Sequence, residues 1–182
     1  QMLFYLPLSG STFKKVYYDA QLDRAVSKFV PAEDLIVPYT ATDLDSCERI
    51  THVVKQSQND IRKKQVAGFY RDIELNPTAE DPTYNSANIQ GKIDQLDGIQ
   101  QTGESYMITL LEMHVDLDLE GYENKDSSGE PTGIKLPYIV TLDEQSGKVL
   151  SIRRNYEEGD ELFKKKQYFV HFKFLPGLGF YG

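Results

Sequence analysis

An alternating run of acidic, imidazole and apolar side chains, Glu-Met-His-Val-Asp-Leu-Asp-Leu-Glu, occupies positions 112–120. Successive side chains of a β-strand point to opposite faces, so a strand here would place all of its polar members on one face. These members are Glu112, His114, Asp116, Asp118 and Glu120. Imidazole and carboxylate groups are ligands for divalent cations. One interpretation is therefore a divalent-metal-dependent hydrolase domain built on His114, Asp116 and Asp118.

The same alternation is also typical of a half-buried strand whose polar face contacts solvent. Side chains two residues apart on one face lie roughly 7 Å from each other, so only adjacent pairs could share one metal ion. We therefore favour the structural interpretation and assign no metal ligand. Like charges on this face would repel one another without basic side chains beside them, and Arg153 and Arg154 are the candidates for that role.

The other histidines and the cysteine lack the surroundings that catalysis needs. His52 and His171 each lie in an apolar, β-branched or aromatic stretch, which predicts histidines packed within a sheet. Cys47 precedes a glutamate, whose charge disfavours a thiolate, so a Cys47–His52 nucleophile pair is also disfavoured. The sequence has neither a nucleophile-elbow serine nor a phosphate-binding glycine loop. It therefore predicts a protein that is not an enzyme, with no catalytic residue and no cofactor.

The composition bounds the class of protein. The 182 residues are 40% hydrophobic and 26% charged, which excludes collagen-like, mucin-like and wholly disordered chains. Lys and Arg total 20 against 28 Asp and Glu, giving a net charge of −8 and a pI near 4.9. A chain this acidic is a poor candidate for holding nucleic acid over its whole surface. The basic triplet Lys164–Lys166 is either a solubilising strand end or a contact for phosphate groups.

Cysteine usage and the two ends of the chain indicate its setting. Cys47 is the only cysteine, which excludes an intrachain disulfide and a four-cysteine zinc site and fits a reducing compartment. The apolar opening at 2–6 stops at Pro7 and is too short to span a bilayer, so we expect no membrane contact. The chain begins at Gln1 and ends in an apolar, Gly-rich run, and we expect both ends to be cuts in a longer protein.

The elements that would position these residues are mostly short strands joined by turns. Alternating and β-branched patterns predict strands at 13–18, 25–30, 34–39, 50–55, 107–119, 136–143, 148–155 and 168–174. Turns at 19–23 and 144–147 join their flanking strands into hairpins. Pro38 cannot donate to a neighbouring strand, so the strand at 34–39 is expected at a sheet edge.

Two short helices are expected among the strands. Ser57 is suited to cap a helix of about three turns, with Asp60 as the acidic partner three residues on. Ile89, Ile93 and Leu96 have helical spacing within a polar, turn-rich excursion at 76–105. The predicted fold is a single α+β domain over residues 1–182, mostly antiparallel β-hairpins and sheet with two short helices.

Several stretches stand out by their order and density along the chain. They are residues 6–10 (LPLSG), 13–18 (FKKVYY), 29–35 (FVPAEDL), 37–39 (VPY), 68–72 (GFYRD), 112–118 (EMHVDLD), 136–141 (LPYIVT) and 168–182 (YFVHFKFLPGLGFYG). Together they resemble the portal proteins of tailed double-stranded-DNA phages, particularly the branch of short-tailed phages. The resemblance covers most of the chain and is weakest at 76–105.

The resemblance implies a structural role rather than an enzymatic one. Portal proteins form a ring, usually of twelve subunits, at one vertex of the phage head, and DNA enters and leaves through it. The ring serves genome packaging, ejection and head–tail joining, while the ATPase chemistry belongs to the separate terminase. The chain resembles the β-rich wing that precedes the stem helices, and the run from Pro176 to Gly182 resembles the point where wing passes into stem.

The implied partners are further copies of the same protein, the packaging motor, capsid proteins and tail adaptors. Double-stranded DNA would pass through the channel without sequence-specific binding. The implied location is the virion, assembled in the cytoplasm of the bacterial host. Candidate contact residues between subunits are Tyr17, Tyr18, Tyr39 and the apolar terminal run, because aromatic side chains are enriched in interface cores.

Overall fold

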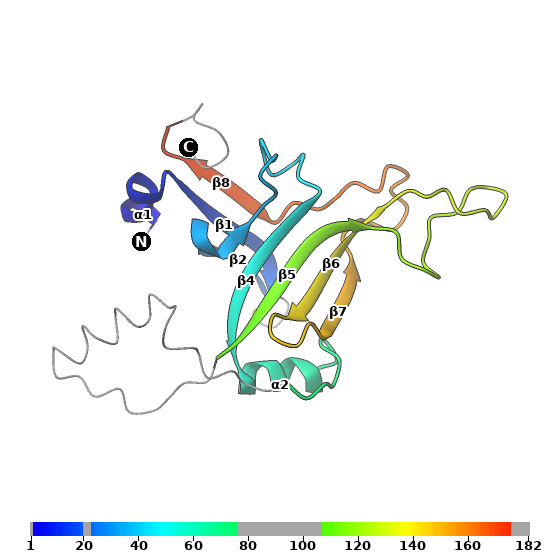
Figure 1. The fold of residues 1–182 in the computed structure, drawn as a ribbon, viewed down its shortest axis with the longest axis horizontal. Coiled ribbons are helices and arrows are strands. Elements are labelled where there is room, and N and C mark those ends of the chain that lie inside the picture. The colour runs from blue at the N-terminus through cyan, green and yellow to red at the C-terminus, as the bar shows by residue number, and fades with distance from the viewer. Residues whose placement is uncertain (1, 20–22, 76–106, 176–182) are drawn as a thin grey trace.

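The computed structural model describes residues 2–19, 23–75 and 107–175 (Figure 1). Over these residues the chain has an α+β fold made mostly of antiparallel sheet, as the sequence predicts. Its strands form one sheet of three strands and one of five. The predicted helix around Ile89 and the polar excursion at 76–105 lie outside the described residues.

The three-stranded sheet brings segments from opposite parts of the sequence together. Strand β1 (Ser11–Asp19) pairs with β2 (Arg24–Pro31) as a hairpin, and its other edge pairs with β8 (Phe169–Lys173). The hairpin and the final strand are both confirmed. Figure 1 shows the first helix, α1 (Met2–Ser9), beside this sheet.

The five-stranded sheet has the order β3-β4-β5-β6-β7. Its strands are β3 (Leu35–Ile36), β4 (Arg49–Ser57), β5 (Met107–Leu117), β6 (Leu136–Asp143) and β7 (Val149–Arg154). The strand expected at 34–39 is shorter than predicted because a 3₁₀ turn, η1 (Ala32–Asp34), takes its first residue and a turn closed by the Ala41 N–H on the Pro38 carbonyl at 3.0 Å follows Ile36. It does lie at the sheet edge, paired only with β4.

Helix α1 was not predicted, because Pro7 looked like the end of an apolar segment. Pro7 lies inside the helix, which ends where Gly10 adopts a φ of 72° and donates its N–H to the carbonyl of Leu6 at 3.0 Å. No side chain of α1 is buried, and its closest ring contact is Tyr5 on Phe29, with centroids 5.5 Å apart. The helix is therefore an apolar element on the outside of the three-stranded sheet.

The second helix, α2 (Gln58–Val66), follows β4 directly and confirms the prediction at Ser57. Ser57 Oγ accepts the backbone N–H of Asp60 at 3.2 Å and donates to its carboxylate at 2.8 Å. Ile61 is the buried residue of the helix and packs against Leu110 and Leu150 of the five-stranded sheet. The cap fixes where the chain turns from strand into helix.

Replacing Ser57 with alanine should lower the free energy of unfolding by about 1 kcal/mol, because the N–H of Asp60 loses its acceptor. Urea denaturation followed by circular dichroism measures the change. Ser27→Ala, which alters an exposed serine of β2, is the control and should have no measurable effect. Equal losses in the two variants would contradict a capping role.

Three apolar clusters hold the elements together. The first joins the two sheets and contains Phe13, Val30, Leu35, Leu44, Cys47, Ile50 and Phe169. The second lies under α2, and the third covers the other face of β6 with Tyr156 and Phe163 from the segment between β7 and β8. The five-stranded sheet is thus covered on both faces. Among the described residues no helix is long and apolar enough to cross a membrane.

Candidate functional site

The polar residues of the alternating run do not share one solvent-exposed face. Strand β5 ends at Leu117, so Asp118 and Glu120 lie in the following loop and are exposed. Glu112 and His114 face the three-stranded sheet, and His114 is only 2% exposed. The imidazole of His114 packs edge-on against the rings of Tyr168 and Phe169. The predicted solvent-facing strand is therefore wrong, because the second sheet covers this face.

Glu112 is the centre of a buried polar cluster between the sheets. Its Oε1 lies 2.5 Å from the ammonium of Lys15 on β1 and 2.9 Å from Nε2 of His114. Burial would raise the pKa of Glu112, but the hydrogen bond of His114 and the charge of Lys15 outweigh it and hold the pKa well below its usual range. An ionised carboxylate only accepts hydrogen bonds, so Nε2 of His114 donates to it. The Lys15–Glu112 pair thus links the two sheets.

The basic partner of this face is Lys15 and not the arginines that the sequence suggested. The guanidinium of Arg153 stacks on the ring of Phe69 at 3.9 Å. Arg154 pairs with Glu158 at 3.6 Å on the surface. Lys15 comes from a strand 97 residues away in the chain, and no local pattern identifies it.

His52 and His171 are sheet histidines, as predicted. His52 lies beside the buried polar cluster, and His171 lies on β8 opposite Phe13. His52 is 5% exposed, stands opposite Glu112 in the β4–β5 register, and packs edge-on against Phe169 with centroids 5.6 Å apart. Its Nδ1 is buried without a hydrogen-bond partner. His171 lies 2.9 Å from Ser11 Oγ and stacks on Phe13. Burial lowers the pKa of both histidines to about 4, and the Lys15 charge adds to the effect at His52.

The lowered pKa of His52 predicts a stability loss in mild acid. The unfolded chain binds a proton on His52 below pH 6.5, and the folded chain binds it only near pH 4, so between these values unfolding takes up a proton. The contribution of His52 to the free energy of unfolding is complete above pH 6.5, and it falls by about 3 kcal/mol as the pH approaches 4. Urea titrations at several pH values measure it. His52→Leu should flatten this pH dependence, and an unchanged slope would contradict the assignment.

The geometry does not favour a metal-dependent hydrolase at His114, Asp116 and Asp118. His114 is bonded to Glu112, whose carboxylate already holds the Lys15 ammonium where a cation would bind. Burial raises the pKa of Asp116 above its ordinary value. Across residues 2–19, 23–75 and 107–175 no group of three or more His, Cys, Asp and Glu side chains is arranged to hold a metal ion.

Cys47 and the basic triplet also have structural roles. Cys47 is 3% exposed, its thiol donates to the carbonyl of Asp43 at 2.9 Å, and burial raises its pKa. Lys165 donates to the carbonyl of Cys47 at 2.6 Å, and Lys166 pairs with Glu157 at 3.2 Å. The Lys165 bond attaches the segment between β7 and β8 to the loop before β4, whereas the Lys166 pair lies within that segment. The sequence suggested a solubilising strand end or a phosphate contact for the basic triplet, and neither interpretation anticipated the bond from Lys165 to Cys47.

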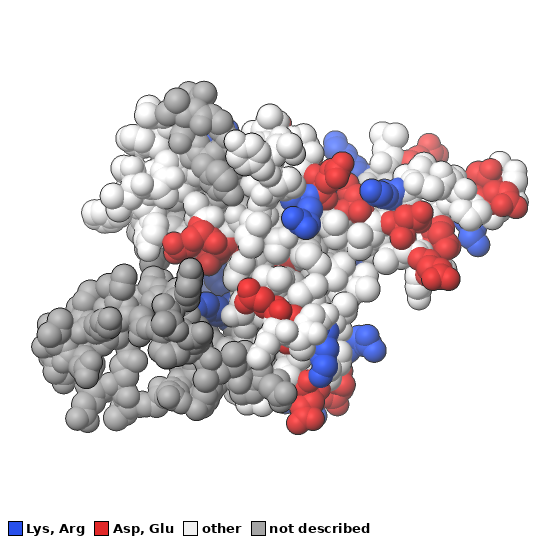
Figure 2. Space-filling model, viewed as in Figure 1, with Lys and Arg blue, Asp and Glu red and all other residues white. Residues whose placement is uncertain are grey.

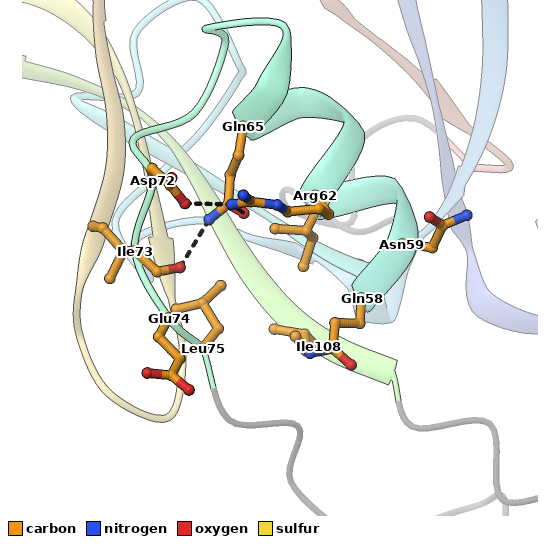
Figure 3. A pocket seen from close by; sticks show the side chains of 10 residues that line it. Gln58, Asn59, Arg62, Gln65, Asp72, Ile73, Glu74, Leu75 and Ile108 are labelled. Atoms are coloured by element: carbon orange, nitrogen blue, oxygen red, sulfur yellow. Dashed lines mark hydrogen bonds and ion pairs between the residues drawn. The ribbon is translucent and has the colours of Figure 1, made fainter.

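A pocket of about 440 Å³ lies beside α2 (Figure 3), and no sequence pattern indicated it. Ile61, Leu75 and Ile108 contribute apolar side chains to it. On its rim Arg62 pairs with Asp72, and Gln65 donates to the carbonyl of Ile73 at 2.8 Å. These partners hold the strand-like segment after α2 against the helix, so the rim's polar groups serve the local fold.

The polar atoms of the buried cluster are thus directed at one another rather than at a space that a ligand could enter. The arrangement can hold the two sheets in register and can respond to protonation. No protein-family model and no curated protein matches the chain.

Proposed function

We propose that this chain is the wing region of a phage portal protein, a structural subunit of the ring through which DNA enters and leaves the phage head. The observation that carries the proposal is the ordered set of stretches between residues 6 and 182 that resembles this family. The proposed partners are copies of the same protein, the packaging motor, capsid proteins and tail adaptors. The proposed location is the virion, after assembly in the host cytoplasm.

The position of the resembling stretches in the fold supports the proposal. The stretches at 13–18 and 29–35 lie on β1 and on β2 to β3. Those at 112–118, 136–141 and 168–174 cover most of β5, β6 and β8. They therefore include the strands on both sides of the seam between the two sheets, as expected if the similarity reflects a shared β-rich wing rather than scattered short matches.

The use of the titratable side chains also supports a scaffold. Lys15, Glu112 and His114 are bonded to one another, and His52 and His171 are packed against aromatic rings. Buried ion pairs that are fully engaged inside a fold are a common structural device. This cluster accounts for Glu112 and His114, two of the groups that first suggested chemistry.

The surface charge fits a protein that does not grip DNA. Figure 2 shows acidic side chains gathered on the arm after β5 (residues 118–135), at the right of the view. Its exposed acids are Asp118, Glu120, Asp126 and Glu130. Negative charge there repels a phosphate backbone, which supports passage of DNA without binding.

Electron microscopy and mass measurement of the full-length protein that contains this chain test the proposal. We expect rings with a central hole and a mass of about a dozen subunits, the usual number in such assemblies. Discrete monomers at assembly concentrations would overturn the proposal.

The proposed contact residues between subunits change slightly with the structure. Tyr18 and Tyr39 are exposed, whereas Tyr17 is partly buried beneath the Lys15 ammonium, 5.7 Å from its ring centroid. We therefore keep Tyr18 and Tyr39 and remove Tyr17 from the set. Double alanine substitution of the two in the full-length protein should reduce the ring fraction, and intact rings would exclude them from the interface.

A further inference from the structure

The inner face of the β1–β2 hairpin changes character along its length. At one end Phe13 and Val30, which are at most 1% exposed, belong to the apolar cluster that joins the sheets. Two residues further from that end the register pair is Lys15, which is partly buried, and Lys28, which is exposed, and none of residues 15–19 and 24–28 is fully buried. The half of the hairpin that contains residues 15–19 and 24–28 is therefore attached less firmly than the half that contains Phe13.

Two bonds connect this less buried half to named partners in other elements. The Lys15 ammonium pairs with Glu112 on β5 at 2.5 Å. The backbone N–H of Val16 donates to the carbonyl of Tyr168, just before β8, at 2.7 Å. The first bond crosses to the five-stranded sheet, and the second ties the hairpin to the end of its own sheet.

His52 lies under this attachment and has no acceptor for an added proton. Its Nδ1 is buried and unpartnered, and Phe169 covers one side of the ring. The charged and titratable groups that act on it are Lys15 on β1, Lys28 on β2, and Glu112 and His114 on β5. Glu112, the one anion of these four groups, is already bonded to Lys15 and His114. An imidazolium at this position would add a cation next to Lys15 without a free acceptor.

We propose that protonation of His52 releases the distal half of the β1–β2 hairpin (residues 15–19 and 24–28) from the five-stranded sheet and from Tyr168, while Phe13 and Val30 keep the other half in place. Release moves Lys15 away and lets water reach the imidazole, which relieves both the desolvation and the repulsion. The inference is independent of the portal assignment and holds for any role of this fold.

The size of the effect follows from linkage. In the closed form His52 has a pKa of about 4, and in contact with water it returns toward its ordinary value of 6.5. The open form therefore binds the proton more tightly, and the opening equilibrium constant rises about tenfold per pH unit as the pH falls between these values. The equilibrium therefore shifts toward the open form as the pH falls from 7 into mild acid.

Amide hydrogen exchange of the 182-residue chain, followed by NMR and corrected for intrinsic rates, tests the proposal. The reporter is the Val16 amide, whose bond to Tyr168 breaks on release, and the reference is the set of amides in the central strand β5. We expect Val16 to exchange faster than the β5 amides, through an opening that low urea does not promote. Its protection should fall at least tenfold from pH 6.5 to 5.

Two variants identify the proton. His52→Leu should abolish the pH dependence at Val16, and His52→Gln serves the same purpose if leucine disturbs the packing. His171→Gln, a change of the other strand histidine with a low pKa, should leave the pH dependence intact. The proposal is overturned if Val16 protection in the natural chain does not change with pH, if it equals that of β5 throughout, or if the slope persists without His52.

Discussion

Replacing Glu112 with alanine should lower the free energy of unfolding by about 3 kcal/mol, as measured by urea denaturation at pH 7. The substitution leaves the Lys15 ammonium and the His114 imidazole in the seam between the sheets without their shared acceptor. The side chains of Lys15 and Glu112 are only 14% and 19% exposed, so solvent replaces little of the lost interaction. This loss would be much larger than that of an ordinary surface ion pair.

Two further variants test whether the loss in Glu112→Ala comes from leaving a buried charge without a partner or simply from losing an ion pair. Asp72→Ala breaks the pair with Arg62, whose side chains are 73% and 58% exposed, and should cost at most about 0.5 kcal/mol. The double variant Lys15→Met/Glu112→Leu removes both charges and should recover most of the stability lost in Glu112→Ala. If the double variant is as unstable as the single one, the stranded ammonium is not the cause.

Replacing Phe169 with alanine should cost about 3–5 kcal/mol, the second large effect that we expect. The ring is 2% exposed and belongs to the apolar cluster that joins the sheets. It packs edge-on against His52 and His114, and the Lys15 ammonium lies 5.8 Å above it. Truncation would leave a cavity at the contact between β8 and the five-stranded sheet, and thermal or urea unfolding measures the loss.

The neighbouring residue provides the control for Phe169. Val170 lies on the same strand but points to the outer face and is 46% exposed. Val170→Ala should change the free energy of unfolding by no more than about 0.5 kcal/mol. A similar loss in both variants would mean that the strand, and not the aromatic contact across the seam, determines the effect.

The elements that were predicted correctly are those with local signals. The hairpin β1–β2, the β6–β7 pair with its turn at 144–147 and the Ser57 cap each depend on residues within a few positions of one another. Helix α1 was missed because Pro7 is a reliable helix breaker in longer helices. In this short helix the Gly10 N–H still donates to the Leu6 carbonyl. This hydrogen bond spans Pro7 and closes the helical turn that contains it.

The candidate site was predicted only in part, for a different reason. Alternation in β5 correctly separates two faces, with Glu112 and His114 on one of them. It does not indicate which face another sheet covers, because that depends on contacts such as Lys15–Glu112, 97 residues apart. The same limit explains why Arg153, two strands away in the sheet, looked like the better partner. Pairings between sheets are not encoded in any single stretch.

The pairing of β1 with β8 has a consequence for the order of folding during synthesis. Ser11 and His171, which contact each other, are 160 residues apart, whereas β5, β6 and β7 follow one another in the chain and pair as neighbours. On the ribosome the β1–β2 hairpin and the β4–β7 meander are available early, but the aromatic side of the seam must wait until Phe169 has emerged from the exit tunnel. Until then Phe13 and Ile50 lack their contact with Phe169, which leaves an apolar surface of the nascent chain open to aggregation.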